Sequence, residues 1–69
     1  MLASSSASTR INKLRAAFGK RSESFYKQVG LRRLRDAKLL YSGNEAYALE
    51  LLAEASQMLA KAEAFDARS

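Results

Sequence analysis

Residues 42–69 read SGNEAYALELLAEASQMLAKAEAFDARS and contain the strongest predicted helix of the chain. From Glu45 to about Ala67 there is no Gly, Pro or β-branched residue, and the best helix formers dominate. Gly43 suits the left-handed residue that closes a preceding helix, and Asn44 suits the N-cap of the next one. We therefore expect a turn at Gly43-Asn44 and then a helix roughly 30–35 Å long, given the rise per residue.

Apolar residues lie on two sides of this helix when they are placed at the α-helical period. The first side is the expected core face, made of Ala48, Leu51, Leu52, Ala55, Met58, Leu59, Ala62 and Phe65. The second side, called the docking seam below, consists of Ala46, Leu49, Ala53, Ala60 and Ala64. Small residues at nearly heptad spacing let another helix approach closely. The seam is either a solvent-facing surface of good helix formers or a contact for a protein partner or another copy of the chain.

Length and composition favour one small domain that gains stability from a partner. The chain has 69 residues and no Cys, so no disulfide can staple it. Thirteen residues are Ala and only three are Phe, which predicts a thin hydrophobic core. A thin core beside one long helix indicates a chain that works while bound to something else.

The net charge of +5 is divided unevenly along the chain. Residues 1–35 carry nine Lys or Arg and one acid, Glu23, whereas residues 36–69 carry three basic and six acidic residues. We expect the first half to meet an anionic partner such as nucleic acid or an acidic surface, and we do not expect a membrane partner. The candidate residues for this contact are Arg10, Lys13, Arg15, Lys20, Arg21, Arg32, Arg33 and Arg35.

The sequence predicts an all-α fold with about three helices and no strand. Residues 1–23 form a basic arm that is rich in Ser and Arg: residues 1–9 are expected to be disordered or extended, and a short amphipathic helix follows over 10–18. One face of that helix carries Ile11, Leu14 and Phe18.

Residues 24–69 are expected to form an antiparallel helical hairpin with its turn at Gly43-Asn44. The first helix of the hairpin spans about 24–42, and either Ser22 or Ser24 caps it. Gly30 lies in its apolar stripe, where it either permits close packing or splits the helix. Arg33 also falls in this stripe, so it is expected to snorkel or to pair with an acid on the neighbouring helix.

Two families have helical hairpins that this one resembles over short stretches. Gly43-Asn44 at the turn, with Ala48, Leu52 and Ala55 after it, resembles a tetratricopeptide-type hairpin, although only one copy is present. The run from Arg33 to Ala62 is similar to the opening hairpin of HEPN-type helical domains. RNA cleavage in that family uses an Arg followed by a His, and this chain contains no His.

We expect neither an enzyme nor a cofactor or metal site. The chain lacks His, the usual general base near neutral pH and a common metal ligand. Glu50 and Glu54 share one helix face, but that face is polar and is expected to be solvated. There is no apolar run of transmembrane length and no secretory signal peptide, so we favour an intracellular location or a place inside a particle.

The leading hypothesis from the sequence is a non-catalytic assembly subunit of a virion or nucleoprotein-type particle. Its hairpin would dock to protein through the seam, and its basic arm would meet an anionic component. One alternative is a stand-alone regulator that binds nucleic acid through Arg32, Arg33 and Arg35. A second alternative is an organellar protein of mitochondrion or plastid, because the acid-free, Ser- and Arg-rich start is typical of a presequence.

Overall fold

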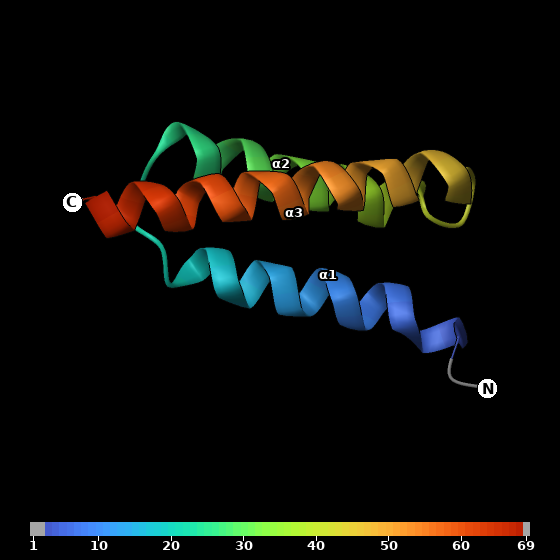
Figure 1. Cartoon of the computed structure of the whole chain (residues 1–69). Helices are drawn as coiled ribbons and strands as arrows, with labels where there is room; N and C mark the ends of the chain where they lie inside the picture. Colours follow the sequence, from blue (N-terminus) through green and yellow to red (C-terminus); the bar gives the residue numbers. More distant parts are fainter. Residues whose placement is uncertain (1–2, 69) are drawn as a thin grey trace.

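Three α-helices make up the computed structural model, which describes the backbone of residues 3–68 and the side chains of residues 8–68. They are α1 (Ala3–Gly19), α2 (Phe25–Leu40) and α3 (Glu45–Arg68). Helix α2 runs antiparallel to α3, and α1 lies along the pair in the same direction as α3 (Figure 1). The all-α prediction and the hairpin are confirmed, and the described residues contain no strand.

Side-chain caps fix the start of both hairpin helices. The Ser24 hydroxyl accepts a hydrogen bond from the Lys27 amide at 3.1 Å, and the Asn44 side chain accepts one from the Tyr47 amide at 3.2 Å. Each bond satisfies one of the amides that a helix start leaves without an intrahelical partner. The structure therefore selects Ser24 over Ser22 as the cap of α2 and confirms Asn44 as the cap of α3.

The turn between α2 and α3 differs from its prediction. No glycine adopts a positive φ, so Gly43 is not the left-handed residue that the sequence suggested. The amides of Gly43 and Asn44 instead donate to the Leu40 carbonyl at 3.1 and 2.7 Å. These bonds satisfy a carbonyl at the end of α2 without a left-handed residue.

The core is built from all three helices. Its buried members are Ile11, Phe18, Leu34, Ala37, Ala48, Leu51, Leu52, Ala55 and Ala62. Most of the predicted core face of α3 is buried or half-buried, but Phe65 is 43% exposed. The Phe65 ring lies at the margin of the hairpin and makes a T-shaped contact with the Tyr26 ring, with ring centroids 6.4 Å apart.

Gly30 allows α1 to pack closely against α2. The helix continues unbroken through this residue, and a Cβ placed there would lie 2.5 Å from Phe18 Cε1 and 2.8 Å from Phe18 Cε2. Phe18 itself is fully buried. Of the two roles predicted for Gly30, the structure shows close packing.

Helix α1 begins earlier than predicted. It starts at Ala3, whereas residues 1–9 were expected to be disordered or extended, and residues 1–2 lie outside the described part. Residues 3–9 contain no Gly or Pro, so nothing in the backbone chemistry stops the helix from extending through them. Ile11 in the middle of α1 and Phe18 near its end belong to the core that the hairpin residues also form, and Leu14 packs against it.

Candidate interaction surfaces

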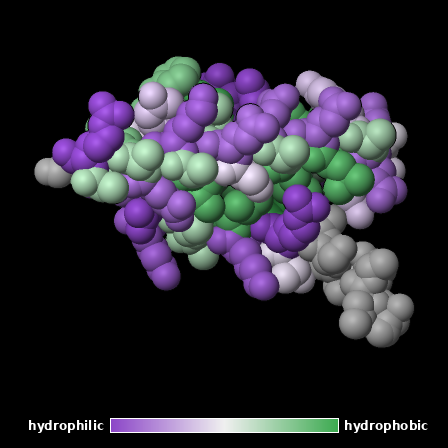
Figure 2. All heavy atoms as spheres, in the orientation of Figure 1, coloured by the Kyte–Doolittle hydropathy of each residue, from purple (hydrophilic) through white to green (hydrophobic). Residues whose placement is uncertain are grey.

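The docking seam lies on the side of α3 that faces away from the core. All five of its residues are exposed, and Leu49, the largest of them, is 39% exposed. Moderately hydrophobic patches lie over α3 among hydrophilic ones (Figure 2). Neither α1 nor α2 covers this side, so α3 keeps an apolar strip about five turns long with no partner among the described side chains.

The cations of α1 project away from the packed face of that helix. Arg10, Lys13 and Arg15 of α1 are all exposed, and so is Lys20, which directly follows the helix. Hydrophilic side chains extend from this side of the molecule (Figure 2). Within residues 8–68, none of these four cations forms a salt bridge. Their charge is therefore available to a partner.

Two of the predicted anion-binding residues pair inside the molecule. Arg33 Nε lies 2.9 Å from Glu54 Oε1 of α3, so of the two predictions for Arg33 the structure shows pairing with an acid on the neighbouring helix. Arg21 Nη1 lies 3.5 Å from Asp66 Oδ2. Both arginines are half-buried, so they contribute less charge to the surface than the exposed Arg32 and Arg35.

The outer face of α2 combines large apolar side chains with cations. Phe25 and Leu39 are the two most exposed large hydrophobic residues of the described chain, at 72% and 70%. Arg32, Arg35 and Lys38 are exposed on the same helix. The apolar stripe predicted for α2 included neither Phe25 nor Leu39, and both lie opposite that stripe at helical spacing.

A latch around Asp66 ties the loop between α1 and α2 to the end of α3. The Ser22 amide donates to Asp66 Oδ2 at 3.2 Å, and Arg21 pairs with the same oxygen. Lys27 Nζ adds a hydrogen bond to the Arg21 carbonyl at 3.0 Å. The sequence did not predict this latch, because its partners are separated by more than forty residues.

The latch predicts acid sensitivity. The Ser22 hydrogen bonds, helped by the charges of Arg21 and Lys27, hold the pKa of Asp66 below its usual value. The carboxylate therefore stabilises the fold above the pKa of an unfolded Asp, about 3.9, and this contribution is lost as pH falls through the lowered pKa. We expect Asp66→Asn to lower the free energy of unfolding at neutral pH. We also expect that free energy to vary less with pH below about pH 4 in the variant than in wild type. Urea unfolding at several pH values measures both effects, and an unchanged pH profile would contradict the role given to the latch.

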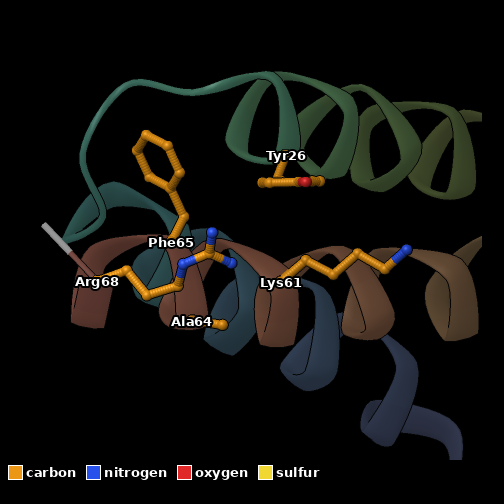
Figure 3. Close-up of a pocket in the computed structure, with 5 residues that line it drawn as sticks. All are labelled: Tyr26, Lys61, Ala64, Phe65 and Arg68. Atoms are coloured by element: carbon orange, nitrogen blue, oxygen red, sulfur yellow. The ribbon is translucent and has the colours of Figure 1, made fainter.

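An open groove borders the end of α3, with a volume of about 510 Å³. Tyr26, Lys61, Ala64, Phe65 and Arg68 line it, with the two aromatic rings above and the two cations along α3 (Figure 3). No polar or charged side chain is buried in the described part of the chain. The groove therefore lacks the enclosed polar groups that usually orient a small ligand.

Comparisons with known proteins add no relative, since no family model, curated protein or solved structure matches the chain significantly. Among the described residues there is no group of three or more His, Cys, Asp or Glu that could hold a metal ion. None of the described helices is long and apolar enough to cross a membrane.

Proposed function

We propose that this chain is a non-catalytic assembly subunit of a nucleoprotein-type particle or virion. In this proposal α1 contacts the phosphate backbone of a nucleic acid, and the docking seam of α3 contacts protein. The observation that carries the proposal is the separation of the two surfaces. Arg10, Lys13 and Arg15 are exposed on α1, a helix that contains no acid, whereas an uncovered apolar strip lies on α3.

The chemistry of α1 suits contact with phosphates without sequence readout. Arg10, Lys13, Arg15 and Lys20 have no internal acidic partner within residues 8–68, so binding a phosphate breaks no salt bridge there. The helix is held by Ile11 and Phe18 in the core, which fixes the cations on a firm backbone instead of a free arm. Such contacts release counterions and give an affinity that falls steeply with salt.

The chemistry of α3 suits contact with a helix of another protein. Alanine side chains project only a short way from α3, so a facing helix can approach closely. Leu49 adds one larger apolar side chain that is already 39% exposed. Burying this strip would add to a core that contains only nine buried hydrophobic residues in the described chain, so it would stabilise a small fold.

Binding to a single-stranded RNA and to a DNA duplex at two salt concentrations tests the nucleic-acid part. Four phosphate contacts, three from α1 and one from Lys20 after it, predict a slope of about −3 to −4 in log K against log salt, or roughly 100-fold weaker binding between about 50 and 200 mM. Replacing Arg10, Lys13 and Arg15 together by Gln should remove most of that slope. Glu50→Gln and Gln57→Glu serve as controls, because they alter exposed charge on α3 and should leave the slope unchanged.

The salt dependence of binding either supports or overturns the nucleic-acid part of the proposal. A salt-dependent affinity that disappears with the three α1 substitutions supports the proposal. Absence of binding at low salt, or an affinity that does not depend on salt, overturns the nucleic-acid part. Binding to an acidic protein in its place would identify the anionic component as protein.

A further inference from the structure

The outer faces of α2 and α3 complement each other in size and in charge. We infer that copies of this chain associate head to tail, with the outer face of α2 of one copy seated on the docking seam of the next. The inference deepens the proposed role of the seam and rests on it, because it names the partner of the seam as a second copy.

The α2 face carries protruding apolar groups in one line. Phe25, Arg32 and Leu39 are seven residues apart in sequence, so they follow one side of the helix over about 21 Å. Phe25 and Leu39 are 72% and 70% exposed, and they mark the two ends of this line. Single exposed apolar residues are ordinary, but two on the same side of one helix give a partner two separate apolar contact points.

The seam of α3 offers the opposite shape. Its alanine side chains are shorter than the exposed side chains at the flanking positions, which include Glu45, Glu50 and Gln57. Protruding side chains of one helix can enter the spaces between small residues of another, as in ridge-into-groove packing. Phe25 and Leu39 would supply the protruding groups, and Ala46, Ala53 and Ala60 would leave the spaces.

The distribution of exposed charge also favours contact between α2 of one copy and α3 of another. On α2 the exposed charged residues are Arg32, Arg35 and Lys38, and all of them are cations. On the first half of α3 the exposed charged residues are Glu45, Glu50 and Glu54, and all of them are acids. Glu54 already pairs with Arg33 of its own chain, so Glu45 and Glu50 are the acids left for a second copy. A contact between α2 and α3 of different copies therefore places opposite charges together, whereas a contact between two α2 faces would place like charges together.

The two faces cannot meet within one copy. Both point away from the core that α2 and α3 share, where Leu34, Ala37, Leu52 and Ala55 are buried. A contact between different patches on the two partners is heterologous, so it continues into a ring or an open filament. The contact uses Arg32 and Arg35 between copies and leaves the α1 cations for the anionic component.

Sedimentation of two blocked variants and their mixture tests the pairing. Leu39→Glu places an acid on the α2 face, and Ala53→Glu places one on the seam. Both positions are exposed, so the fold has room for the new side chain. We expect wild type to form assemblies larger than a dimer as its concentration rises, and each variant alone to associate at least tenfold more weakly. An equimolar mixture should form a dimer and stop there, because each variant keeps the face that the other has lost.

Asn12→Glu is the matched control, since it adds the same charge at an exposed position of α1 and should associate like wild type. A wild-type chain that stays monomeric at millimolar concentration overturns the inference. So does association that survives Leu39→Glu but not Ala53→Glu, because that result indicates a symmetric contact between two seams. The proposed function is tested by a different measurement, the dependence of nucleic-acid binding on the α1 cations. Ala53→Glu should leave that dependence unchanged, so failure of one proposal can be told from failure of the other.

Discussion

Gly30→Ala is expected to destabilise the chain by about 1–3 kcal/mol, although the same change in an exposed helix interior stabilises by up to about 1 kcal/mol. The reason is the Phe18 ring, which occupies the space that the new methyl group needs. The ring is fully buried among core residues, so it cannot move aside without disturbing them. Thermal unfolding followed by circular dichroism should show a midpoint lower by about 4–8 °C for each kcal/mol.

Two further variants separate overpacking from a general effect of the substitution. Gly19→Ala is the matched control, because a Cβ at Gly19 meets nothing within 4 Å, and it should be neutral or slightly stabilising. Phe18→Leu removes the outer ring atoms, so Gly30→Ala should lower the free energy of unfolding much less in that background. Equal costs of Gly30→Ala in the two backgrounds would show that Phe18 is not the cause.

Removing α1 is expected to abolish the fold of the hairpin. A chain of residues 24–69 lacks Ile11 and Phe18, and truncation of a buried side chain of this size costs about 2–5 kcal/mol each. It also lacks Arg21 and Ser22, so Asp66 loses both partners of the latch. The combined loss is comparable with the whole stability of a small domain, about 5–15 kcal/mol.

Circular dichroism of residues 24–69 measures this effect. We expect low helix content and no cooperative thermal transition, whereas the full chain should unfold cooperatively. A shortened chain that melts cooperatively with the helix content of the hairpin would show that residues 1–23 are dispensable for folding. That result would support the division into an arm and a separate hairpin that the sequence predicts.

The sequence predicted the hairpin well because local signals agree with the packing. Asn44 caps α3, Ala48, Leu52 and Ala55 repeat at helical spacing, and all three enter the core. The interaction of Arg33 with an acid was also predictable, since a cation in an apolar stripe needs a partner. The cap and the apolar repeat depend on residues close in sequence or on one helical period. The position of Arg33 indicated an acidic partner on the neighbouring helix but did not identify Glu54.

The features that the sequence did not reveal depend on contacts between distant segments. The start of α1 at Ala3 was missed because a run of Ser and Ala carries no hydrophobic period to indicate a helix. The latch on Asp66 needs the end of α3 to lie beside the loop after α1, and that placement follows only from the assembled bundle. The exposure of Phe25 and Leu39 likewise follows from which side of α2 the other two helices cover.

The proposed function makes the two surfaces independent, with α1 for nucleic acid and α3 for protein. An NMR titration of the labelled chain with a single-stranded RNA at low salt tests this claim most directly. The account predicts that the largest amide shift changes cluster around Arg10, Lys13 and Arg15 of α1, while the amides of Ala53 and Ala60 on the seam stay unchanged. Changes confined to α3, or no change at any residue, would contradict it.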